Sequence, residues 1–238
     1  GSYKLKEFKQ GQDIELIAFE NYFEGTPKIE KILYKFLPDP NTSFLYLKQQ
    51  KLDIDGLSPI QVDRQLDNNF RNNYTIMQKP SFSFSYLGFN LKNEKFKDIR
   101  IRQALSLAID RQELVDILFF GYGKVCNGPF LPNSFAYNED IKTITQDIIK
   151  AKELLKEAGY DENHPFSFEV VTNTGNDIRI NAALILQYQL QKAGIKMNIR
   201  VMEWQAFLNT VVHPRNFEAV LLGWSMALMP DAYPIWHS

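Results

Sequence analysis

The alternation of apolar and polar positions is most regular between Phe96 and Gly123. Apolar residues there recur at i, i+3, i+4 and i+7, the spacing that places side chains on one face of an α-helix. They are Ile101, Ala104, Leu105 and Ala108. Asp110, followed by Glu113 three residues later, is typical of a second helix start, and Gly121 and Gly123 predict its end. We therefore expect two helices laid end to end, with no catalytic group between them.

The second half of the chain alternates between helical and strand patterns. The predicted order is helix 148–158, strand 166–172, helix 178–193, strand 195–202, helix 204–211 and strand 218–222. Such alternation implies a sheet with a parallel component and covering helices. The fold class is therefore α/β, with a mixed β-sheet flanked by helices.

The first half is less regular, and its strands need not be parallel. Period-2 patterns and flanking turn residues predict strands over 13–20, 28–37, 52–56, 74–78 and 83–90. A turn at 38–42 leads into one helix, and Ser58-Pro59 is typical of the start of another. The polar, proline-containing segment 124–143 is predicted to be a loop.

Composition narrows the class of protein. The 238 residues are 45% hydrophobic and carry a formal net charge of −1, which supports a packed core and argues against a dominant nucleic-acid-binding surface. No apolar run approaches the length of a membrane span. The one cysteine, Cys126, excludes an internal disulfide framework. Gly1-Ser2 resembles a cloning remnant, and we expect the chain to be a piece of a longer protein.

Candidate catalytic and metal-binding patterns are weak. The segment Gly223–Ala227 half-resembles a nucleophile elbow around Ser225, but Pro230 and Pro234 disfavour the helix that such an elbow requires. The three histidines lie far apart in predicted loops, and neither His-x-x-x-His nor Cys-x-x-Cys spacing occurs. We therefore expect no enzyme activity, no metal site and no cofactor.

Ligand-binding candidates lie where predicted strands end. Trp224, Asp231, Tyr233 and Trp236 follow the last strand, and open α/β sheets bind ligands beyond the carboxyl ends of their strands. These aromatic residues either form a ligand site or pack against a missing part of the protein.

Two polar candidates accompany them. Asn173 ends another strand, and Arg179 begins the following helix, a combination that suits a carboxylate; the alternative is a surface arginine. Tyr86, within the strand predicted over 83–90, completes the expected ligand contacts.

The ordered motifs resemble the family 5 extracellular solute-binding proteins, which are the dipeptide-, oligopeptide- and nickel-binding components of ABC importers. The segment FKDIRIRQALSLAIDR is similar to the family pattern F-x-D-x-R-V-R-x-A-L-x-x-A-(I/M)-(D/N)-R. Four further landmarks follow the family's order, at 1–5, 151–160 (AKELLKEAGY), 203–208 (EWQAFL) and 217–224 (FEAVLLGW). Together they cover essentially the whole chain.

The resemblance implies one lobe of a type II periplasmic-binding-protein-like fold. Residues 1–238 would form the second, ligand-binding lobe, with both termini at the crossings to a missing first lobe. Hinge closure would trap a peptide or similar small solute for delivery to an ABC permease. The protein would be periplasmic or lipid-anchored at the outer face of the cytoplasmic membrane. Alternatives are a receptor for a nickel chelate or haem, and the ligand-sensing domain of a regulator.

One departure from the family concerns the ligand's amino group. In peptide binders an aspartate a few residues after the Gly-Trp pair anchors that group, and the matching position here is Ala227. A buried ammonium without a carboxylate is unfavourable. The resemblance therefore implies either that Asp231 substitutes or that the ligand lacks a free amine.

Overall fold

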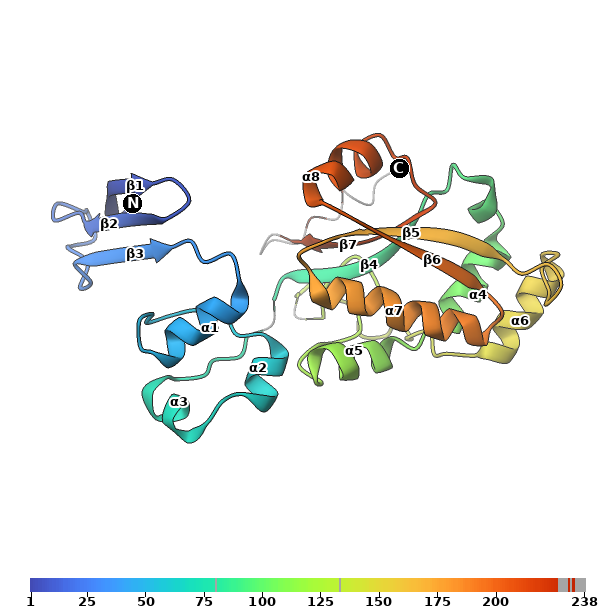
Figure 1. Ribbon diagram of the computed structural model, residues 1–238, viewed down its shortest axis with the longest axis horizontal. Helices are drawn as coiled ribbons and strands as arrows, with labels where there is room; N and C mark the ends of the chain where they lie inside the picture. Colours follow the sequence, from blue (N-terminus) through green and yellow to red (C-terminus); the bar gives the residue numbers. More distant parts are fainter. Residues whose placement is uncertain (80, 133, 227–230, 232, 234–238) are drawn as a thin grey trace. The chain divides into compact units, whose positions relative to one another are not determined.

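The computed structural model describes all residues of the chain except 80, 133, 227–230, 232 and 234–238 (Figure 1). The fold divides into two compact units, Gly1–Thr75 and Ile76–Ser238. Each is described by itself. In the part of the chain that the structure describes, no helix is both long and apolar enough to cross a membrane.

The first unit begins with an antiparallel three-stranded sheet in the order β1-β2-β3. Its strands are β1 (Tyr3–Lys9), β2 (Asp13–Ala18) and β3 (Lys31–Lys35). The sequence patterns predicted β2 and β3, although β3 is shorter than the predicted range. The edge strand β1 was not predicted, because its charged residues conceal the alternation.

Three short helices complete this unit: α1 (Pro40–Lys48), α2 (Pro59–Arg64) and α3 (Asn68–Asn73). Asp39, Ser58 and Asp67 cap their first turns by accepting hydrogen bonds from backbone N–H groups. The predicted start at Ser58-Pro59 is confirmed, with a reciprocal capping box to Gln61. The polar helix α3 was not predicted, since Phe70 is its one buried residue.

The strands predicted over 52–56 and 74–78 are wrong: neither segment forms a strand. They are extended connections in which the Tyr74 hydroxyl donates to the carbonyls of Leu47 (3.0 Å) and Leu52 (2.6 Å). The apolar residues of these segments do not mark a buried strand face, since Ile54 is 90% and Met77 76% exposed.

The second unit contains a four-stranded mixed sheet in the order β4-β7-β5-β6. Its strands are β4 (Ser83–Phe89), β5 (Ser167–Asn173), β6 (Lys196–Met202) and β7 (Ala219–Ser225). Strand β5 is parallel to β6 and β7, whereas β4 is antiparallel to β7. The predicted α/β class with a mixed sheet is confirmed.

Helices cover both faces of this sheet (Figure 1). The larger core lies beneath α4 (Ile99–Ala108), α6 (Ile148–Glu157) and α7 (Asp177–Lys192), with α5 (Arg111–Phe119) beside α7. The smaller core lies beneath α8 (Trp204–Phe207) and the π-helical turn η2 (Leu208–Val212).

The expected pair of helices between Phe96 and Gly123 is confirmed as α4 and α5. The Asp110 carboxylate caps α5 by accepting from the Glu113 N–H (3.0 Å). The chain leaves α5 in the left-handed conformation at Phe120 and Gly121, with φ of 50° and 77°. Only Gly121 adopts this conformation without strain.

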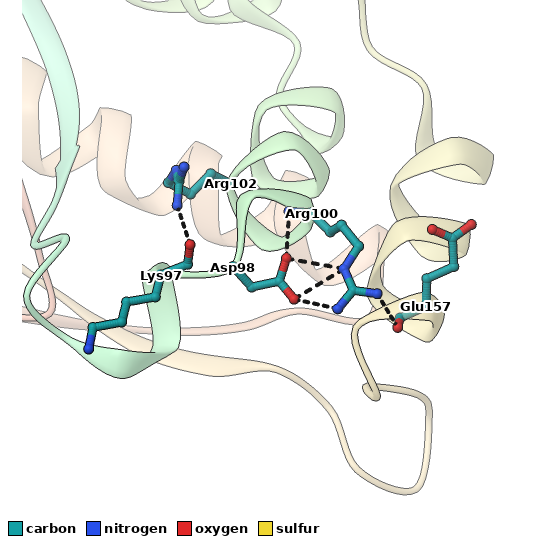
Figure 2. A network of polar contacts seen from close by, with 5 residues as sticks. All are labelled: Lys97, Asp98, Arg100, Arg102 and Glu157. Atoms are coloured by element: carbon teal, nitrogen blue, oxygen red, sulfur yellow. Dashed lines mark hydrogen bonds and ion pairs between the residues drawn. The ribbon is translucent and has the colours of Figure 1, made fainter.

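A polar network fixes the start of α4, just after the 3₁₀ turn η1 (Glu94–Phe96) (Figure 2). The Asp98 carboxylate caps the helix by accepting from the Arg100 N–H (2.8 Å), and it also accepts from the Arg100 guanidinium (2.6 Å to Nη2). The same guanidinium donates through Nη1 to the Glu157 carbonyl at the end of α6 (2.6 Å). One arginine therefore joins the start of α4 to the end of α6.

A second arginine, Arg102, secures the turn before the helix. Its Nη1 donates to the carbonyls of Phe96 and Lys97 (2.9 Å to the latter). Phe96 is fully buried and packs against the rings of Phe89, Phe166 and Phe168. The motif F-x-D-x-R-x-R thus consists of a core aromatic, a helix cap and two carbonyl clamps.

We expect Asp98→Ala to lower the melting temperature of the chain by about 2–6 °C, because it removes both a helix cap and the partner of Arg100. Thermal unfolding followed by circular dichroism measures the change. Asp140→Ala is the control, since the exposed Asp140 carboxylate makes no hydrogen bond or ion pair among the described residues. Equal melting temperatures for the two variants would contradict the proposed role of Asp98.

This contribution should also depend on pH. Hydrogen bonds from the Arg100 side chain and N–H lower the pKa of Asp98 in the folded state. The carboxylate therefore stabilises the fold above the unfolded-state pKa of about 3.9, and this stabilisation is lost as the pH falls through the lower folded-state pKa. The difference in melting temperature between wild type and Asp98→Asn, which keeps the cap, should be constant from pH 7 to 5 and vanish in stronger acid. A difference that persisted unchanged below pH 3 would refute this assignment.

Candidate ligand-binding site

The parallel strands β5, β6 and β7 end at the same edge of the sheet. Strand β5 stops at Asn173 and β6 at Met202. Strand β7 continues to Ser225, and its last residues, from Gly223 onward, pair with β4 and not with β5. The space beyond the end of β5, beside β7, is where ligands of open α/β sheets bind.

Arg179 occupies the first turn of α7 at this edge. Asn176 caps the helix, with its side-chain oxygen accepting from the Arg179 N–H (2.9 Å). The Arg179 guanidinium donates through Nη1 to the Asn173 side-chain oxygen, and Asn173 in turn donates to the Thr174 carbonyl (2.7 Å). The structure therefore brings Asn173 and Arg179 together, as the sequence predicted.

The Arg179 guanidinium has no carboxylate partner among the described residues. Its Nε atom is buried and makes no hydrogen bond within the part of the chain that the structure describes. Burial lowers the pKa of Arg179, yet an arginine keeps its charge at physiological pH. The first turn of α7 adds positive potential to the same place. The Arg179 guanidinium and the start of α7 together form a positively charged place that has no anionic partner among the described residues.

Two glycines make room for the site. A Cβ atom at Gly223 would lie 2.9 Å from the Phe84 carbonyl oxygen and 3.5 Å from Arg179 Nη2. A Cβ atom at Gly88 would lie 2.9 Å from the Tyr86 ring. Gly223 thus lets the guanidinium approach β7, and Gly88 lets the Tyr86 ring lie along β4.

Tyr86 and Trp224 are linked across β4 and β7. The Tyr86 side chain lies close enough to Trp224 and to Arg179 for both residues to affect its ionisation. Burial raises the pKa of Tyr86 despite the opposing effects of Trp224 and the Arg179 charge. Four of the five predicted residues, Asn173, Arg179, Tyr86 and Trp224, therefore form one connected group.

Trp204 was predicted only as part of a helical stripe. It begins α8 directly after the end of β6, and 39% of its surface is exposed, similar to 43% for Trp224. The signal that could have identified it is its position just beyond the carboxyl end of a predicted parallel strand.

Asp231 is not drawn into this group in the part of the chain that the structure describes. It is exposed, and its Oδ1 accepts from the Tyr233 N–H (2.9 Å). Ala227, the position that corresponds to the family's amine-anchoring aspartate, lies outside the described residues, as does Trp236. The proposed substitution by Asp231 remains a prediction.

Ser225 does not have the geometry of a nucleophile elbow. It pairs with Ser83 inside β7, and the next residue, Met226, still donates its N–H to the Phe82 carbonyl (2.6 Å). A nucleophile elbow requires a sharp turn at the serine. Within the described residues, no group of three or more His, Cys, Asp or Glu side chains is placed to hold a metal ion.

A groove of about 550 Å³ lies elsewhere on the second unit. It includes Asn90 at the end of β4, Glu169 near the start of β5 and Glu218 just before β7. None of the five predicted site residues lines it. The candidate site is defined by strand topology and by Arg179, which has no carboxylate partner among the described residues, rather than by groove size.

The chain belongs to the family described as "Bacterial extracellular solute-binding proteins, family 5 Middle", whose sequence profile matches residues 1–238. This family comprises substrate-binding proteins of transporters rather than enzymes. The resemblance inferred from the ordered motifs is confirmed.

Individual relatives agree with this assignment. The oligopeptide-binding protein AppA of Bacillus subtilis is 38% identical over 251 residues, covering 100% of this chain and 46% of its own length. Its structure in complex with a nonapeptide superposes with a TM-score of 0.79 at 35% identity, covering 100% of this chain and 49% of that one. NikZ of Campylobacter jejuni, in complex with Ni(L-His), has a TM-score of 0.80 at 27% identity, covering 98% and 47%. The chain therefore spans about half the length of the relatives it matches.

We expect Gly223→Ala to destabilise the second unit by about 1–3 kcal/mol, because its methyl group would press on the β4 backbone and the guanidinium. Urea unfolding measures the loss. Gly128→Ala is the matched control, since a Cβ there meets nothing within 4 Å. Similar unfolding free energies for both variants would show that Gly223 does not control the approach of β4, β7 and Arg179.

Proposed function

We propose that this chain is the ligand-binding part of an ABC-importer receptor that captures a peptide or a similar small solute bearing a carboxylate. The observation that carries the proposal is Arg179, a charged group at the carboxyl edge of parallel strands with no anion beside it among the described residues. A partly buried charge without a counter-ion is unfavourable, and a ligand carboxylate would supply one.

The surrounding groups suit a peptide. Trp204 and Trp224 are partly exposed at the carboxyl ends of β6 and β7, and the Tyr86 hydroxyl can donate a hydrogen bond to a ligand acceptor. Apolar walls with a few polar anchors are the usual composition of small-ligand sites. The structure of AppA in complex with a nonapeptide supports this ligand class.

The remaining assignments concern the whole protein. The chain would form the second lobe, closing on a first lobe that supplies the other half of the site, and the liganded protein would deliver its cargo to ABC permease subunits. Its location would be periplasmic, or at the outer face of the cytoplasmic membrane through a lipid anchor. No catalytic role, cofactor or nucleic-acid partner is assigned.

A second ligand class is a metal chelate or haem. The relatives include proteins named as nickel-binding and haem-binding, such as NikA of Staphylococcus aureus, 31% identical over 85% of this chain. Mass spectrometry and metal analysis of the purified full-length protein would distinguish a bound peptide from a chelate. A helix-turn-helix segment in the full gene would instead support a ligand-sensing regulator.

In the full-length protein, we expect Arg179→Ala to weaken binding of peptides with a free carboxyl terminus by about 1.5–3 kcal/mol, as for a hydrogen bond to a charged group. Calorimetry with peptides of three, five and nine residues, each as the free acid and as the amide, measures this. The amides should bind wild type and variant equally, because they lack the anion.

Arg215→Ala is the control, since Arg215 is an exposed arginine in the turn before β7, near the opposite edge of the sheet. An equal loss of affinity for acids and amides would remove Arg179 from carboxylate recognition. Unchanged affinity for the acids would remove it from the site altogether.

A further inference from the structure

The three-stranded sheet of the first unit has two chemically different faces. Antiparallel pairing aligns two cross-strand rows on one face: Leu5, Leu16 and Ile32, and Phe8, Ile14 and Tyr34. Tyr3 and Ala18 extend the same face. Every side chain on this face, hereafter the apolar face, is aliphatic or aromatic.

A β-bulge in β1 creates this segregation. The register shifts between Leu5 and Glu7, so Lys6 and Glu7 both lie on the opposite face and Phe8 returns to the apolar face. Without the extra residue, strict alternation would have placed Phe8 among the charges.

The opposite face is already satisfied by its own charges. Glu15 is almost fully buried there between the ammonium groups of Lys6 (2.9 Å) and Lys31 (3.1 Å). These bonds lower the pKa of Glu15, so the carboxylate stays ionised. This face therefore needs no further partner.

The apolar face has no such cover within its unit. Leu5, Phe8 and Tyr34 are 64%, 57% and 55% exposed. Small antiparallel sheets require a packed apolar face for stability, and contiguous exposed apolar patches mark interaction sites. A face made of two complete cross-strand rows resembles half of a protein core.

We propose that the apolar face packs against the other half of the full-length protein, as a permanent contact between the two parts of the chain. The inference rests on the proposed function, in which this chain is one part of a two-lobed receptor. The length of the relatives indicates what covers the apolar face. Relatives that match this chain from end to end are about twice as long, so about half of each relative is available to cover this face. The partner surface is an apolar layer of that remaining half.

Cysteine labelling tests the proposal. Leu5→Cys and Phe8→Cys place thiols on the apolar face, and Ile17→Cys and Leu33→Cys place matched thiols on the opposite face, where the native residues are 38% and 41% exposed. Each is made in a Cys126→Ala background, and its reaction rate with N-ethylmaleimide is compared between the 238-residue chain and the full-length protein. We expect at least a ten-fold slower reaction in the full-length protein at positions 5 and 8, and similar rates in both at 17 and 33.

Oxidative footprinting of Phe8 and Tyr34 in the unsubstituted proteins gives the same comparison if a cysteine variant does not fold. Equal reactivity in both proteins would overturn the proposal. Slow labelling of the 238-residue chain by itself would also overturn it. If the labelling rate did not depend on protein concentration, the chain would cover its own apolar face. If labelling became slower at higher protein concentration, a second copy of the chain would cover that face. Ligand capture is measured separately by mass spectrometry. A protected face without a ligand refutes the proposed function alone, and a bound ligand with an exposed face refutes this inference alone.

Discussion

The two arginine clamps at the start of α4 are the constraint on which the second unit depends. Arg102 holds the carbonyls of the turn that delivers Phe96 to the centre of the aromatic core, and Arg100 ties the Asp98 cap to the last turn of α6. Because α4 and α6 lie over the same face of the sheet as α7, fixing them also defines the surface on which α7 packs. The position of Arg179 at the start of α7 is thus supported by residues that are far from it in the sequence.

The hydrogen-bond partners of polar side chains differ between the scaffold of the second unit and the candidate ligand site. Where polar groups serve the scaffold, they are matched: Asp98 with Arg100, Glu169 with Arg200 (3.0 Å), and the buried Gln189 with Asp110 and Glu113. Arg179 differs, since its partner among the described residues is the neutral Asn173 and its Nε is unpaired. Among the described residues, Arg179 Nε is the one buried side-chain nitrogen or oxygen without a hydrogen bond, and it lies at the carboxyl edge of parallel strands, which suits the proposed ligand site.

Sequence reasoning succeeded where local chemistry decides the structure. The helical periodicity and the end signals at Asp110 and Gly121 located α4 to α7, because helix periodicity and end effects are short-range. It failed at 52–56 and 74–78, where the alternating apolar residues belong to exposed connections rather than to a sheet. It also could not foresee that Tyr86 and Trp224 meet, since strand register is set by the whole sheet.

The two incomplete features of the chain call for different kinds of partner. The apolar face of the first unit would remain unfavourably hydrated whenever it was uncovered, so the partner that we propose for it is a permanent part of the folded protein. Arg179 is only partly buried, and its guanidinium can exchange water for a carboxylate at modest net free energy, which suits reversible binding. A receptor of the proposed kind would need both features: hydrophobic burial for the lasting contact between its halves, and a cation without a carboxylate partner, such as Arg179, for reversible capture of a solute.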